Sequence, residues 1–100
     1  GSPFSATIDR TMNLTKLTYV FYVSTTNNAS NYWSIDLDKG GTSIKTLTTA
    51  SAAPNAFAQV SWTFSSTSVS AADKVLRVSV SKVGSPGNLY LPGPVLEISA

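Results

Sequence analysis

Apolar and polar side chains alternate along two long stretches of this chain, and this alternation limits the possible fold more than any other feature of the sequence. In residues 14–24, LTKLTYVFYVS, β-branched and aromatic side chains dominate, and the latter part places a large apolar side chain at every second position. Residues 32–39, YWSIDLDK, repeat the pattern, with Trp33, Ile35 and Leu37 on one face. A period of two is that of a β-strand with one face against a core, so we expect strands here.

Turn signals divide the rest of the chain into short segments of the same kind. Gly40-Gly41 supplies the positive-φ residues of a tight hairpin. Pro92-Gly93-Pro94 breaks the last segment, because proline cannot donate to a sheet ladder. About seven or eight short strands result, which predicts an all-β antiparallel sandwich of the jelly-roll type. The remaining strands are expected at residues 4–9, 42–49, 57–66, 74–83 and 89–99, and the loops at 25–31, 50–56, 67–73 and 84–88.

The length and composition indicate one folded domain. One hundred residues match a single ordinary domain, so we expect one β-sandwich over residues 1–100. Charged residues make up only 12% of the chain, about half the usual share. The regular apolar blocks argue against disorder. Gly1-Ser2 has the form of a cloning scar.

Charge and cysteine content exclude several classes of function. Seven Lys and Arg residues stand against five Asp and Glu, and they are spread along the chain rather than gathered in a stripe. We therefore expect no nucleic-acid partner. No apolar run reaches the roughly 18 residues of a membrane span, so we expect no membrane insertion. Because the chain has no cysteine, disulfides and zinc-thiolate sites are excluded.

The titratable residues give little support to an enzyme. The chain has no histidine, which removes the commonest general base. Asp36 and Asp38 lie two apart on one strand face, about 6.6 Å between their Cα atoms. That spacing suits a glycosidase pair, but both side chains are expected to point from a single strand into solvent beside a hairpin. We expect no enzymatic activity.

The same acids raise the alternative of a structural calcium ion. The sequence DLDKGG at residues 36–41 is similar to the start of a calcium loop, in which oxygen ligands alternate before a glycine. The later ligands, above all a closing glutamate, are absent at the required spacing. Asp36, Asp38 and Asp73 are the candidate calcium ligands, and the simpler alternative is a solvated strand face. We expect no other cofactor.

Aromatic residues on the polar phase of the strands are the candidates for binding. Trp33 and Trp62 share the phase of their apolar neighbours, so we expect both in the core. Three tyrosines have the opposite phase, where they suit a sugar platform, a protein interface or a second packed surface. Loop asparagines bind sugars or, more commonly, form turns. The candidate ligand-binding residues are Tyr22, Asn31, Tyr32, Asn88 and Tyr90.

Two short motifs carry a resemblance to a known group of proteins. NYWSIDL at residues 31–37 and SKVGSPGNLYLPG at residues 81–93 resemble the jelly-roll or galactose-binding-like β-sandwich modules of bacteriophage structural and appendage proteins. The resemblance extends over residues 14–96. It implies a non-catalytic module of a tail, neck or capsid, often trimeric and sometimes glycan-binding.

These observations together predict a non-catalytic structural or adhesive interaction module of a phage virion, such as a decoration or fibre domain. We expect it in a virion or outside the cell, with other virion or host-chain subunits as partners and a homo-oligomer, preferably a trimer, as the assembly. A glycan is a further candidate partner. Edge strands of a sandwich invite pairing, and few charges protect the edges here. The alternative is a carbohydrate-binding module of a secreted enzyme or cell-surface protein.

Overall fold

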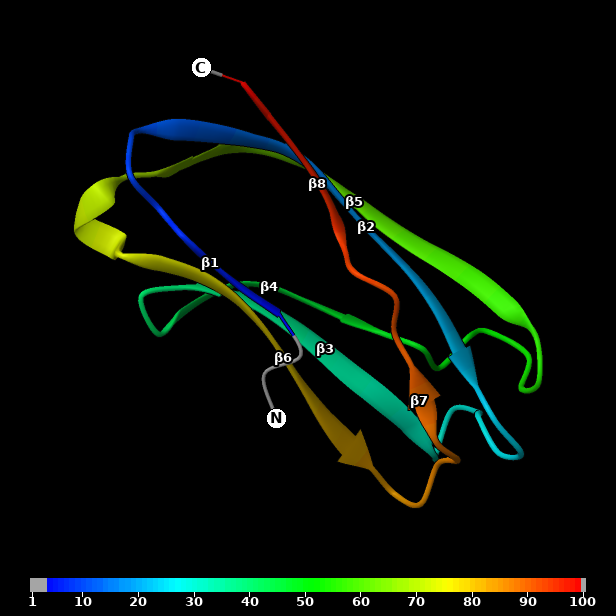
Figure 1. The fold of residues 1–100 in the computed structure, drawn as a ribbon. Helices are drawn as coiled ribbons and strands as arrows, with labels where there is room; N and C mark the ends of the chain where they lie inside the picture. The colour runs from blue at the N-terminus through cyan, green and yellow to red at the C-terminus, as the bar shows by residue number, and fades with distance from the viewer. Residues whose placement is uncertain (1–3, 100) are drawn as a thin grey trace.

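The computed structural model describes residues 4–99 as two antiparallel β-sheets packed face to face (Figure 1). Gly1-Ser2, the suspected cloning scar, lies outside this range. The strands are β1 (Phe4–Thr7), β2 (Met12–Val23), β3 (Tyr32–Lys39), β4 (Thr42–Thr48), β5 (Phe57–Val69), β6 (Val75–Val83), β7 (Leu89–Tyr90) and β8 (Val95–Ser99), and a 3-10 helix, η1 (Ala71–Asp73), joins β5 to β6.

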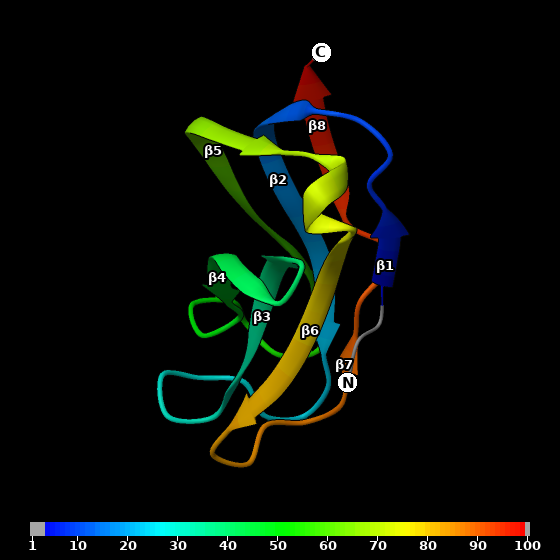
Figure 2. The same cartoon turned by 90° about the vertical axis from the view of Figure 1, so that its left-hand side faces the viewer.

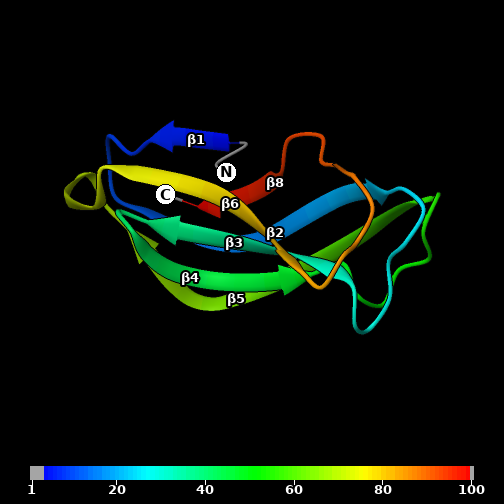
Figure 3. The same cartoon turned by 90° about the horizontal axis from the view of Figure 1, so that it is seen from below.

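The strand order defines two layers. Sheet A contains β1, β6, β3 and β4 in that order, side by side in Figure 3. Sheet B has β5 on one side of β2 and both β7 and β8 on the other (Figure 2). The predicted antiparallel sandwich is confirmed. Its jelly-roll topology is not confirmed, because a jelly roll has eight strands in two sheets, whereas β7 and β8 together fill one position beside β2.

The core lies between the sheets and follows the alternation seen in the sequence. Strand β2 is central in sheet B, and its side chains Leu17, Tyr19, Phe21 and Val23 are at most 3% exposed. Sheet A covers them with further buried side chains, among them Ile35 of β3. Each buried side chain of this size contributes about 1.5–3 kcal/mol to folding. The period-two pattern therefore identified the core face of β2 and β3 correctly.

Strand β5 is longer than the sequence indicates. It continues through residues 67–69, which were expected in a loop, because these residues pair with the start of β2. The pairing is interrupted where residues 64–66 of β5 stand opposite the single residue Thr15. The bulge leaves Phe57–Thr63 as an unbroken ladder against β2.

Asp38 does not point into solvent as the alternation predicts. It is only 5% exposed, because Arg77, its direct partner on β6, and the turn at Gly41 cover it. The carboxylate accepts hydrogen bonds from the Gly41 N–H at 3.1 Å and from Arg77 Nε at 3.2 Å. A buried carboxylate requires such donors, and here they close the hairpin between β3 and β4.

The two tryptophans differ in burial although both have the inward phase. Trp33 is half-buried, packs against the core and donates from Nε1 to the Gly87 carbonyl oxygen at 2.8 Å. Trp62 is 45% exposed, which contradicts its predicted core position. It lies on the edge strand β5, so its ring is covered from one side only, and Lys45 Nζ stands 3.5 Å from the ring centroid.

Tyr19 has a buried hydroxyl group without a hydrogen-bond partner among residues 4–99. Burial raises the pKa of this phenol far above its ordinary value, and the charge of Asp36 adds to the shift. Because the folded state favours the neutral phenol, the Tyr19 contribution to stability is complete below the unfolded pKa of about 10 and falls as the pH rises above it.

We expect Tyr19→Phe to raise the free energy of unfolding by about 1 kcal/mol, because it removes a buried polar group that has no partner. The variant should also lose less stability than the wild type between about pH 9 and pH 11. Urea unfolding at a series of pH values measures both effects. A Tyr19→Phe variant less stable than the wild type at neutral pH would show that the hydroxyl is satisfied.

Candidate functional site

The outer face of sheet B gathers three aromatic rings. Because Leu17, Tyr19 and Phe21 of β2 point into the core, Tyr22 points outward. Tyr22 pairs directly with Phe57 of β5 on one side and with Tyr90 of β7 on the other. Directly opposite residues share a face of the sheet. We call Tyr22, Phe57 and Tyr90 the ring cluster.

The rings of the cluster touch one another but stay accessible. The centroid of Phe57 lies 5.3 Å from that of Tyr22 and 6.1 Å from that of Tyr90, with tilted and edge-to-face arrangements. These separations are those of attractive ring pairs. Phe57 is still 64% exposed and Tyr90 60% exposed. The cluster is thus held in place while it offers apolar surface to a ligand.

The surroundings of the ring cluster carry no charge along β2 and β5. Next to it on the same face stand Val20 and Gln59, which pair with each other, followed by Thr18 and Ser61. The first charged side chain in this direction is Lys16, six residues from Tyr22 and so about 20 Å away. The face therefore suits an uncharged ligand with both apolar and hydroxyl groups.

The structure brings together only two of the predicted ligand-binding residues. Tyr22 and Tyr90 meet in the ring cluster, whereas Tyr32 is half-buried on sheet A, where it pairs with Val83.

The two asparagines hold loops in place. Asn31 Oδ1 accepts a hydrogen bond from the Ser85 N–H at 2.8 Å, and Asn31 Nδ2 donates to Asn28 Oδ1 at 3.1 Å. The Asn88 N–H donates to Ser24 Oγ at 3.0 Å, which anchors the turn before β7. The Asn31 side chain thus fits the turn-forming alternative, whereas Asn88 is exposed and holds this turn through its backbone.

Phe57 is the member of the ring cluster that the sequence did not identify as a candidate for binding. It begins β5 on the phase opposite to Val60 and Trp62, so the alternation alone would have placed it outward. Its value as a binding residue depends on the register that sets it beside Tyr22, and no local pattern in the sequence gives that register.

The three candidate calcium ligands are not gathered into one group, and each has partners in the fold. Asp36 accepts hydrogen bonds from the Ser43 and Thr46 hydroxyl groups, and Asp38 is paired with Arg77. Asp73 accepts a hydrogen bond from the Ser70 N–H at 2.8 Å. Among residues 4–99 no three His, Cys, Asp or Glu side chains lie close enough to hold a metal ion.

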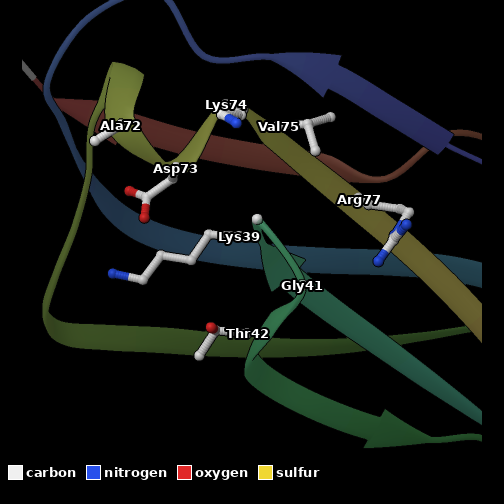
Figure 4. Close-up of a pocket in the computed structure, with 9 residues that line it drawn as sticks. Lys39, Gly41, Thr42, Ala72, Asp73, Lys74, Val75 and Arg77 are labelled. Carbon is white, nitrogen blue, oxygen red and sulfur yellow. The ribbon is translucent and has the colours of Figure 1, made fainter.

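A polar pocket of about 450 Å³ lies between the β3–β4 hairpin and η1 (Figure 4). Its cations include Lys39 and Arg77, and both have partners in the fold. Lys39 Nζ donates to the Ser68 carbonyl oxygen at 3.1 Å, and Arg77 pairs with Asp38. The pocket lies at the junction of the hairpin, η1 and the start of β6, and Lys74 is its third cation.

Comparison with known proteins gives no relative for this chain. No protein-family model, curated protein or solved structure matches it. None of the helices in residues 4–99 is long and apolar enough to cross a membrane.

Proposed function

We propose that this domain is a non-catalytic adhesive module that binds a neutral glycan through the ring cluster. The observation that carries the proposal is the exposure of Phe57 and Tyr90 on an uncharged face, with Tyr22 between their strands. Exposed aromatic clusters of this kind are typical of recognition surfaces.

The chemistry of the ring cluster matches that of a sugar. The C–H face of a pyranose is apolar and packs on an aromatic ring, while its hydroxyl groups need donors and acceptors nearby. Hydrogen-bond donors and acceptors are present on the same face, in the phenol groups of Tyr22 and Tyr90 and the side-chain amide of Gln59. An anionic ligand would gain nothing from this part of the surface, since the nearest cation along β2 is Lys16.

The carboxylates support the non-catalytic part of the proposal. Asp36 and Asp38, whose spacing along the strand suits a glycosidase pair, are bound by donors of their own sheet. Neither lies on the face that carries the ring cluster, because both belong to β3 of sheet A. The resemblance to phage appendage modules suggests the setting, a virion in which the module attaches to other subunits.

We expect the domain to bind neutral oligosaccharides on an array that also carries anionic ones. A Phe57→Ala/Tyr90→Ala double variant should bind at least about 30-fold more weakly, because each buried aromatic contact contributes more than 1 kcal/mol. Tyr32→Ala is the matched control, since it removes a tyrosine from the other sheet. It should bind as the wild type does.

Two results would contradict this function. One is an array on which the wild-type domain binds no neutral sugar. The other is neutral-sugar binding that survives the double variant while Tyr32→Ala abolishes it, which would move the site to sheet A. Circular dichroism of each variant establishes that the fold is retained.

A further inference from the structure

Strand β5 is an unprotected sheet edge. It pairs with β2 alone in sheet B and is the longest strand, with 13 residues. Its sequence, FAQVSWTFSSTSV, contains no charge, no proline and no glycine. Natural sandwiches protect such edges with charges, prolines or short strands, because unpaired N–H and C=O groups template pairing with another chain.

The other three edges of the sandwich have such protection. Strand β1 has only four residues, and β8 has five and follows Pro92 and Pro94. Strand β4 carries Lys45, whose ammonium group covers the Trp62 ring. Among the strands of residues 4–99, only β5 combines an uncharged edge with seven residues of unbroken ladder, Phe57–Thr63, and its bulge lies beyond them.

The regular part of β5 is complementary to itself. Phe57–Thr63 is unbroken, and Val60 is its midpoint. If two copies pair antiparallel about Val60, every residue of this segment has a partner. Trp62 then faces Ala58 of the other copy, Phe57 faces Thr63, and Gln59 faces Ser61, so large side chains meet small ones and polar meet polar. No charged side chains of β5 are brought together, which removes the usual barrier to pairing identical strands. The nearby Lys45 ammonium group of β4 lies on the Trp62 ring of its own copy.

The size of this contact fits a dimer of modest affinity. Seven paired residues span about 24 Å along the strands. The two sheets of each copy lie about 10 Å apart, and the edges of both contribute to the area buried in the contact. We estimate a total buried area of about 1,000 Å², near the lower limit for a specific interface. Interfaces of this size are typically weak and transient, so we expect the dimer to dissociate at micromolar concentrations.

We infer that β5 pairs antiparallel with β5 of a second copy of this chain, so that sheet B continues across a two-fold axis. The joined sheet carries two ring clusters on one face, with their Phe57 residues about 20 Å apart along the strands. A repetitive glycan bound by both clusters would gain avidity. This contact gives a dimer and not the trimer expected from the sequence.

Light scattering over a concentration series from about 1 µM to 1 mM tests the pairing. The mass should rise from that of the 10.5 kDa monomer to twice that value. In the Gln59→Lys/Ser61→Lys double variant each lysine faces a lysine of the other copy, so dimerisation should weaken at least about tenfold. Mixing it with a Gln59→Glu/Ser61→Glu variant should restore a dimer containing one copy of each.

The control variant is Ser5→Lys/Thr7→Lys, which adds the same charge to exposed positions of the edge strand β1. It should dimerise like the wild type. A wild type that stays monomeric at 1 mM would overturn the inference. The inference would also be overturned if a dimer or trimer persisted in the variant with lysines in β5. The same holds if the β1 variant, rather than the β5 variant, disrupted the assembly. Glycan binding by a monomer would leave the ring cluster intact and reject only the pairing.

Discussion

Replacing Gly87 with alanine is expected to lower the free energy of unfolding by about 3 kcal/mol or more. A β-carbon at this position would stand 1.5 Å from the Ser24 carbonyl oxygen and 2.7 Å from Thr25 Oγ1. The obstacle is backbone, so relief requires one chain segment to move. Movement would strain two hydrogen bonds of Gly87, one from its N–H to the Thr26 carbonyl oxygen and one from Trp33 Nε1 to its own carbonyl oxygen.

Gly93→Ala is the matched control for this prediction. No atom lies within 4 Å of a β-carbon built on Gly93, so the change should alter stability by less than about 1 kcal/mol. Thermal unfolding measures both variants, and 3 kcal/mol corresponds to a decrease of about 12–24 °C in Tm for a domain of this size. Equal Tm values for the two variants would show that the turn is not packed against residues 24–26.

The fold class was predictable because it depends on a local signal. Alternation over β2 and β3 identified the core side chains, and Pro92-Gly93-Pro94 marked the break between β7 and β8. Hairpin signals at Gly40-Gly41 were likewise local, and both glycines have positive φ in the structure. Each of these features is set by neighbours along the chain, so no knowledge of the tertiary structure was required.

The errors arose where tertiary pairing determines the environment. Alternation gave Trp62 the correct phase, but its exposure follows from the position of β5 at a sheet edge, which periodicity does not encode. Asp38 became buried because Arg77 on β6 and the turn at Gly41 cover it. The same limit applies to the candidate site: the outward phase of Tyr22 and Tyr90 was readable from the sequence, whereas their meeting with Phe57 depended on strand order.

The turn that carries the resemblance has a structural explanation. Gly84 has a φ of +71°, and a β-carbon there would stand 2.3 Å from the Ser30 carbonyl oxygen. Gly87 is packed as tightly against Ser24. The GSPGN turn is therefore constrained by its contacts with the loop that follows β2, and it positions β7 so that Tyr90 reaches the ring cluster.

Replacing Asn27 with alanine is expected to lower the free energy of unfolding by about 3 kcal/mol. Asn27 is 5% exposed, and its Nδ2 donates to the carbonyl oxygens of Thr49 at 2.6 Å and Ala52 at 2.8 Å. Its Oδ1 accepts from Thr49 Oγ1 at 2.7 Å, and the same hydroxyl accepts from the Trp33 N–H at 3.0 Å. Alanine leaves these groups without partners in a region where water does not replace them easily. Urea unfolding measures the loss.

Asn27→Asp distinguishes the lost hydrogen bonds from the lost volume. An ionised carboxylate has almost the shape of the amide but would direct an oxygen at two carbonyl oxygens, whereas a protonated carboxyl group donates one hydrogen bond. The folded state thus favours the protonated form, and the stability of this variant should decrease as the pH rises through the unfolded pKa of about 3.9. Relative to the wild type, Asn27→Asp should be more destabilised at about pH 7 than at about pH 3, while Asn27→Ala should be equally destabilised at both. A loss independent of pH in both variants would mean that Asn27 acts by filling space, and that the loops after β2 and β4 are joined by packing alone.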